Sequence, residues 1–247
     1  MGTRMAMACA GRPRVFHPSA PVLRYGNRPV VGLPWNWADD GLYLRQGESV
    51  ARWLNGETGK WLGKYDPVVL EKAPLFGASL GLLYVLRMPL RIVEFGLLVL
   101  VAFLFRAAVR PVISLKGWQF AIVMLFVVGL PCLPGELRLL RSTFQLALTA
   151  SCLTAAVGLT LRAVSSGTAQ GIWALLTGGS LALAYLNREE TVWLYPVVAG
   201  SALFVGGIGL RRREWRRAIA VPVVIAFSFA IPVGLVQLLN LRHYGYR

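Results

Sequence analysis

The charged side chains that could do chemistry stand beside apolar stretches, and two of them are adjacent carboxylates. Asp39 and Asp40 come directly before a stretch with the spacing of an amphipathic helix. An aspartate at a helix start usually caps the first backbone N–H groups. Adjacent residues on a helix point in different directions, so we expect at most one of the two to cap. The other is a candidate for chemistry, although a cap beside a solvated acid explains the pair equally well.

Two more charged groups lie between apolar stretches. Arg188, Glu189 and Glu190 are consecutive, and a solvated turn with acids at a helix start is their default interpretation. Arg138 lies in a segment that we interpret as an interfacial turn. The alternative interpretation of both groups is a role in a functional site.

The sequence predicts no metal site and no cofactor. Cys9, Cys132 and Cys152 form no CxxC pair. Two of these cysteines lie inside apolar stretches, where cysteine is usually a small buried hydrophobe. His17 and His243 are far apart and have no neighbouring ligand residues.

Composition indicates a membrane protein. The 247 residues are 56% hydrophobic and 15% charged, whereas a soluble domain carries about 25% charged residues. The net charge of +15 would suggest nucleic-acid binding in a soluble protein. Here the basic residues lie mostly in short connections between apolar stretches, as anchors at a cytoplasmic membrane surface do. We therefore predict an all-α, polytopic bundle in a lipid bilayer, typical of a bacterial plasma membrane, with no nucleic-acid partner.

Six apolar stretches are each close to the ~20 residues that cross ~30 Å of hydrocarbon. They are Leu90–Val109, Gly117–Pro134, Thr143–Leu161, Thr168–Asn187, Thr191–Leu210 and Ala218–Leu241. Pro74–Leu86, with about 13 residues, is too short to cross, so we expect a short interfacial helix there. These elements predict an N-terminal segment over residues 1–73 and a membrane domain over residues 74–247.

Loop charge gives the expected orientation. Arg211–Arg217 holds five arginines and one glutamate, which predicts a cytoplasmic loop. Counting back through the spans puts Arg106–Lys116 and Arg162–Gly167 on the same side. These three loops hold nine basic residues, against five in the opposite set. Residues 1–73 would then be extracytoplasmic, on a face that also carries Glu71, Lys72, Glu136, Arg138, Arg141, Arg188, Glu189, Glu190 and Arg242.

Four motifs occur along this face. They are Asp39-Asp40-Gly-Leu-Tyr-Leu-Arg, Lys60-Trp61-Leu62-Gly63-Lys64-Tyr65, Glu71-Lys72-Ala73-Pro74-Leu75 and Tyr185-Leu-Asn-Arg-Glu-Glu-Thr-Val-Trp-Leu-Tyr-Pro196. In this order they resemble the GT-C superfamily of membrane glycosyltransferases. The resemblance is greatest to the bacterial branch that uses polyprenyl-phosphate sugars, which includes the aminoarabinose and protein mannosyl transferases.

The resemblance implies transfer of a sugar from a polyprenyl-phosphate donor to an unidentified acceptor at the extracytoplasmic face, with inversion. Asp39 or Asp40 would be the general base, since partial desolvation can raise a carboxylate pKa towards that of a useful base. Lys72 would bind the donor phosphate and stabilise the leaving group. Further residues on the face of this site would be Arg138, Arg188, Glu189 and Glu190.

Alternative functions follow from departures from the family pattern. The family has a span before the acidic loop and continues beyond the sixth span, so the resemblance implies a chain shortened at both ends. A truncated, non-catalytic relative or an assembly partner is therefore the main alternative. A transporter is less favoured, because the spans lack the buried charges and repeated broken helices of transport pathways.

Overall fold

The computed structural model describes residues 24–25, 28–29, 38–63, 73–113, 116–124, 141–164 and 168–245. The chain divides into two compact units, Met1–Val31 and Gly32–Arg247. In the first unit, β1 (Arg24–Tyr25) pairs antiparallel with β2 (Arg28–Pro29). The described helices all belong to the second unit.

Among the described residues, five helices are long and apolar enough to cross a membrane, so the all-α polytopic bundle predicted from the sequence is confirmed. They are α4 (Leu90–Val109), α6 (Arg141–Leu161), α7 (Thr168–Asn187), α8 (Tyr195–Arg211), which follows the 3-10 helix η2 (Glu189–Leu194), and α9 (Trp215–Tyr244). Of the predicted span Gly117–Pro134, the structure describes α5 (Lys116–Met124), and residues 125–134 lie outside the described residues.

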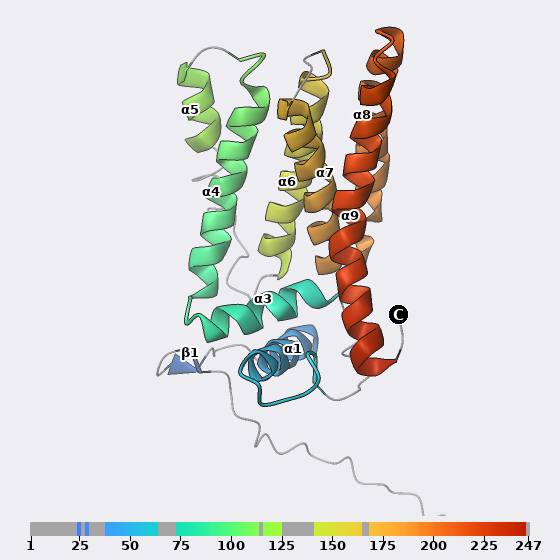
Figure 1. Cartoon of the computed structure of the whole chain (residues 1–247). Helices are drawn as coiled ribbons and strands as arrows, with labels where there is room; N and C mark the ends of the chain where they lie inside the picture. The colour runs from blue at the N-terminus through green and yellow to red at the C-terminus, as the bar shows by residue number, and fades with distance from the viewer. Residues whose placement is uncertain are drawn as a thin grey trace, which may run out of the picture. The chain divides into compact units, whose positions relative to one another are not determined.

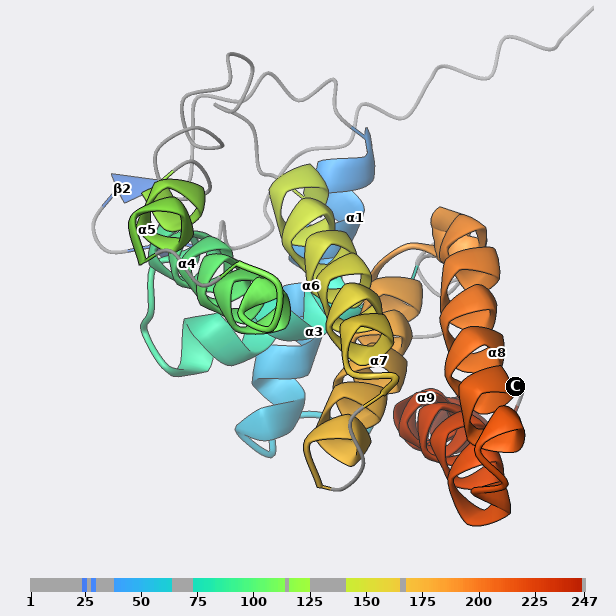
Figure 2. The same ribbon diagram turned by 90° about the horizontal axis from the view of Figure 1, so that it is seen from above.

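The long helices alternate in direction and stand side by side (Figure 1). In the view along the bundle, α7 lies between α6 and α9, with α4 beyond α6 and α8 beside α9 (Figure 2). Small residues allow the close approaches that membrane helices need. A Cβ atom on Gly178 of α7 would collide with Ser228 and Ile225 of α9, and one on Gly158 of α6 would collide with the Trp173 ring.

The outward faces of the long helices carry large apolar side chains. Leu100 of α4, Leu203 of α8 and Phe227 of α9 are each more than half exposed, at 61%, 76% and 63%. A helix that is apolar on its exposed face as well as its packed face is typical of a membrane span. These faces fit contact with lipid.

Two shorter helices cover one end of the bundle. α1 (Ala38–Leu54) and α3 (Pro74–Val85) lie across the end where α4, α6 and α8 begin (Figure 1). With 12 residues, α3 is about 18 Å long and too short to cross a membrane. We call this the α1–α3 end. α1 packs on α3, and both helices belong to the compact unit Gly32–Arg247.

The opposite end carries most of the basic loops. α4 and α6 end there with Arg110 and Arg162 close behind, and α8 joins α9 there through Arg212–Glu214. We call it the arginine end, after Arg162, Arg212, Arg213, Arg216 and Arg217.

Candidate functional site

The candidate general bases lie within the first turn of α1. The helix begins at Ala38, so Asp39 and Asp40 are its second and third residues. This position agrees with the expectation that the acidic pair lies near a helix start, and that at most one of the two caps the helix stays a prediction. Carboxylates in a first turn are still favoured there by the positive end of the helix dipole.

Two of the other predicted site residues, Lys72 and Arg138, lie outside the described residues. Arg188 and Glu189–Glu190 occupy the turn from α7 into η2. Arg188 pairs with Glu190 at 2.6 Å, with the Arg188 side chain partly exposed and that of Glu190 largely exposed, as expected of a solvated turn. The bundle brings this turn and α1 to the same end, as the loop counting predicted.

Three glycines fix the crossing of α1 over α3. Gly47 of α1 faces Gly77 and Gly81 of α3, and a Cβ atom on Gly81 would come within 2.6 Å of the Gly47 carbonyl oxygen. Glycines four residues apart on one helix face allow such close approach of backbones. Asp39 and Asp40 precede Gly47 by seven or eight residues, so the acidic turn lies roughly 11 Å along α1 from this crossing.

An aromatic column ties α1 and α3 to the bundle. The Tyr43 ring meets Phe76 edge-on at 5.5 Å, and Phe76 packs on Phe144 of α6 at 5.8 Å. Tyr43 and Phe76 are almost fully buried. Such pairs add about 0.5–1.5 kcal/mol beyond the area that they bury. The column gives the tyrosine of the acidic motif a structural role.

The Lys60–Gly63 turn is fixed to the last turn of α9. Trp61 donates a hydrogen bond from Nε1 to Asn240 Oδ1 at 3.1 Å. The Tyr244 hydroxyl accepts from the Leu62 backbone N–H at 2.9 Å and donates to the Gly63 carbonyl at 3.1 Å. Gly63 has a φ of 87°, which favours glycine. Three of the six residues of the second motif therefore bind the last turns of α9.

A buried polar network lies under the Arg188–Glu190 turn. Asn187 Nδ2 donates to Gln145 Oε1 at 2.7 Å, and Gln145 Nε2 donates to Thr191 Oγ1 at 3.0 Å. Thr191 in turn donates to the carbonyls of Ala184 or Arg188. The network locks α6, α7 and η2 in one arrangement. Sequence reasoning missed it, because Gln145 lies 42 residues from Asn187 and neither residue stands out within an apolar span.

The α1–α3 end thus combines a rigid scaffold with exposed charge. Glycine contacts, aromatic packing and the polar network fix the helices and the turn, and the Arg188–Glu190 pair lies at the surface of this end. Among the described residues no group of His, Cys, Asp and Glu could hold a metal ion. Carboxylates and guanidinium groups such as those of Glu190 and Arg188 can support acid–base and electrostatic chemistry.

At the arginine end, guanidinium groups cap the helices. Arg162 donates to the carbonyls of Ala107 and Ala108 of α4 and stacks 4.6 Å from the Trp173 ring. Arg217 donates to the Ala163 carbonyl and to Gln170 Oε1. The last carbonyls of a helix lack partners within it, so these bonds satisfy them.

The charge of this end is permanent near neutral pH. Burial lowers the pKa of the Arg162 guanidinium from its usual value, yet an arginine keeps its proton in proteins. The basic residues between apolar stretches predicted that one end of the bundle is basic, but the sequence did not indicate which arginines bind carbonyls.

Known proteins give no further guide to this site. The sequence matches no protein-family model, and comparison with curated proteins and with solved structures finds no match.

Proposed function

We propose that this chain is a membrane glycosyltransferase of GT-C type, which moves a sugar from a polyprenyl-phosphate donor to an acceptor hydroxyl at the α1–α3 end. The observation that carries the proposal is the packing of α1 on α3. That packing joins the acidic first turn of α1 to the helix that directly follows Lys72, at the bundle end that also holds the Arg188–Glu190 turn.

The proposed reaction needs one base and one fixed positive charge. Asp39 or Asp40 takes the proton of the acceptor hydroxyl, whose oxygen bonds to the anomeric carbon as the bond from that carbon to the phosphate oxygen breaks. The polyprenyl phosphate leaves with the electron pair, and the anomeric centre inverts. Lys72 stabilises the phosphate as its charge increases. We place this face outside the cytoplasm of a bacterial plasma membrane, from the distribution of basic residues in the loops.

The experiment is sugar transfer from a polyprenyl-phosphate donor by the purified full chain. We expect the double variant Asp39→Asn/Asp40→Asn to transfer sugar ~10²–10⁴-fold more slowly, because this is the rate factor that a positioned base contributes. Glu48→Gln is the matched control, since Glu48 is a carboxylate of the same helix that pairs with Arg52 on an exposed face. Full activity of the double variant, with Glu48→Gln equally active, would exclude these bases.

One observation favours a second function, that of a non-catalytic assembly partner. The Lys60–Gly63 turn, which carries the second motif, is bound to α9 through Trp61 and Tyr244. Its residues therefore have a structural reason to be present that needs no substrate. A folded, unmodified chain that transfers no sugar from any polyprenyl-phosphate donor tested would select this function over the transferase.

A further inference from the structure

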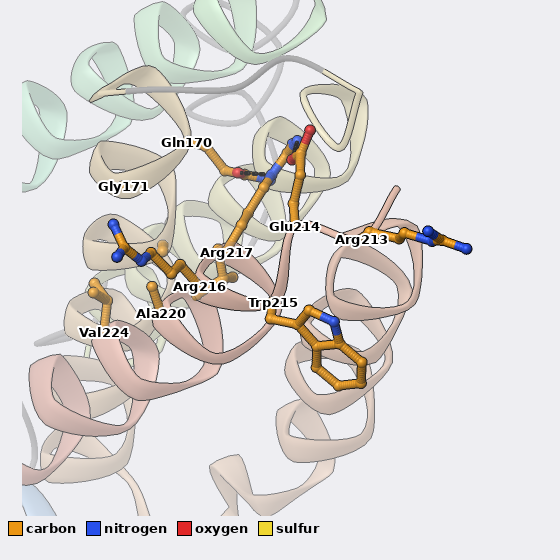
Figure 3. A pocket seen from close by; sticks show the side chains of 11 residues that line it. Gln170, Gly171, Arg213, Glu214, Trp215, Arg216, Arg217, Ala220 and Val224 are labelled. Atoms are coloured by element: carbon orange, nitrogen blue, oxygen red, sulfur yellow. Dashed lines mark hydrogen bonds and ion pairs between the residues drawn. The ribbon is translucent and has the colours of Figure 1, made fainter. Parts of the chain in front are cut away.

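A cavity of about 590 Å³ opens at the arginine end, between the first turns of α7 and α9 (Figure 3). It lies at the opposite end of the bundle from the proposed transferase site. Its polar lining is Gln170, Arg213, Glu214, Arg216 and Arg217. The rest is apolar or small, including Gly171, Ala174, Val221 and Val224.

Gln170 offers an unused hydrogen-bond donor at this cavity. Its side chain is only 3% exposed, and its Oε1 accepts from Arg217 Nε at 2.6 Å. That bond orients the amide, while Nε2 has no hydrogen-bond partner among the described residues. A buried polar group without a partner costs about 1–3 kcal/mol. A ligand oxygen that accepts from Nε2 would remove this cost.

The charges around Gln170 favour an anion. Arg216 makes no ion pair or hydrogen bond through its side chain to a described residue, and it extends between α7 and α9 (Figure 3). Glu214 is the carboxylate in the lining, and Arg217 already binds it at 2.8 Å. The first turns of α7 and α9 add the partial positive charge of two helix N-termini.

The apolar part of the cavity suits a hydrocarbon chain. Gly171 leaves open space where a side chain would stand, since a Cβ atom there would meet nothing within 4 Å. Ala174, Val221 and Val224 continue this surface along the two helices. The neighbouring outward residues Leu175 and Ile219 are exposed and apolar, so the cavity borders the lipid-facing surface.

We propose that this cavity binds an anionic phospholipid, with the phosphate at Gln170 Nε2 and Arg216 and an acyl chain along Gly171, Ala174 and Val224. Basic pockets between membrane helices on the cytoplasmic side are suited to such head groups. A free phosphate shares the head-group chemistry but would leave the apolar surface uncovered, so we commit to the lipid.

The test measures lipid binding to the purified, delipidated full chain in non-ionic detergent by native mass spectrometry. Dioleoylphosphatidylglycerol should bind at one saturable site, more than tenfold tighter than dioleoylphosphatidylcholine. Inorganic phosphate should neither bind with comparable affinity nor displace the lipid. Equal binding of the two lipids, or displacement by phosphate, would overturn the proposal.

Two matched pairs of variants test the location. Gly171→Leu should weaken phosphatidylglycerol binding at least tenfold by filling the cavity, while Gly179→Leu, also in open space on α7, should not. Arg216→Ala should weaken binding about fivefold, as loss of one basic contact near a membrane does. Arg211→Ala removes the same charge from an exposed position outside the cavity lining and should have little effect.

Gel filtration and the melting temperature without lipid establish that each variant is folded. Equal affinities within either pair would overturn the proposed location. Should Gly171→Leu fail to fold, the arginine pair and the comparison of lipids on the unmodified chain decide the question.

Discussion

The side chains of the quoted motifs have two kinds of role, and only one could be predicted from the sequence. Asp39 and Asp40 were correctly expected near the start of a helix, because polar residues ahead of an amphipathic pattern are a local signal. The partners of Trp61 could not be predicted, since Asn240 lies 179 residues away. Local spacing carries no information about such contacts, and the resemblance gave this motif no structural role.

The acidic pair makes an asymmetric prediction. Asp39→Asn and Asp40→Asn each keep the shape of the side chain but remove a base. Since adjacent residues of α1 point about 100° apart, only one can face the acceptor. We expect one variant to lose ~10²-fold or more in turnover and the other to lose little. Single-turnover transfer at saturating donor measures this, and equal effects of the two substitutions would contradict it.

Adjacent glycines of α7 make a prediction about stability. Gly178 leaves no space for a side chain against Ser228 and Ile225 of α9, whereas Gly179 faces open space. Gly178→Leu should therefore destabilise the bundle by about 1–3 kcal/mol or more through overpacking. Gly179→Leu should leave stability unchanged or raise it, because leucine favours a helix more than glycine does. Thermal unfolding in detergent compares the two, and a Gly178→Leu variant as stable as its neighbour would contradict the α7–α9 contact.

At the scale of elements, the spans were predictable and the contacts between them were not. Apolar length alone gave Leu90–Val109 and Thr168–Asn187 with the bounds of α4 and α7. The short Pro74–Val85 helix was recognised by its length. The crossing of α1 over α3 and the arginine caps depend on three-dimensional neighbours, so sequence periodicity did not indicate them.

The contact between the Lys60–Gly63 turn and α9 can be tested by removing one hydroxyl group. Tyr244→Phe keeps the ring but removes the bonds to the Leu62 N–H and the Gly63 carbonyl. Loss of such bonds at a partly buried site costs about 1–3 kcal/mol. We expect faster hydrogen exchange over residues 60–63, read by mass spectrometry.

The control for this variant is Tyr195→Phe. The Tyr195 hydroxyl makes no hydrogen bond to a described residue, and its ring packs beside Tyr185 and Phe229 as a phenylalanine would. Exchange over residues 60–63 should match the unmodified chain in this control. Unchanged exchange in Tyr244→Phe as well would mean that the turn is held in another way.

At the scale of the whole molecule, the two ends of the bundle differ in the elements that cover them and in their charge. The α1–α3 end is covered by two helices that lie across it and carries the proposed transferase site (Figure 1). The arginine end carries the guanidinium groups that name it and the cavity proposed to bind lipid (Figure 3). This division follows from alternating spans and loop charge, both of which could be counted in the sequence. The cavity could not be predicted from the sequence, because Gln170 and Arg216 come from different helices.

The orientation of these two ends is the central claim, because the proposed donor, acceptor and lipid sites all depend on it. Glu57 follows α1 and Arg211 ends α8, and both are exposed, at opposite ends of the bundle. The measurement introduces Glu57→Cys or Arg211→Cys into a chain in which Cys9, Cys132 and Cys152 are replaced. A membrane-impermeant maleimide is then applied to cells. Glu57→Cys should be labelled in intact cells, and Arg211→Cys only after permeabilisation. Labelling of Arg211→Cys but not Glu57→Cys in intact cells would reverse the orientation, and labelling of both from outside would contradict the bundle itself.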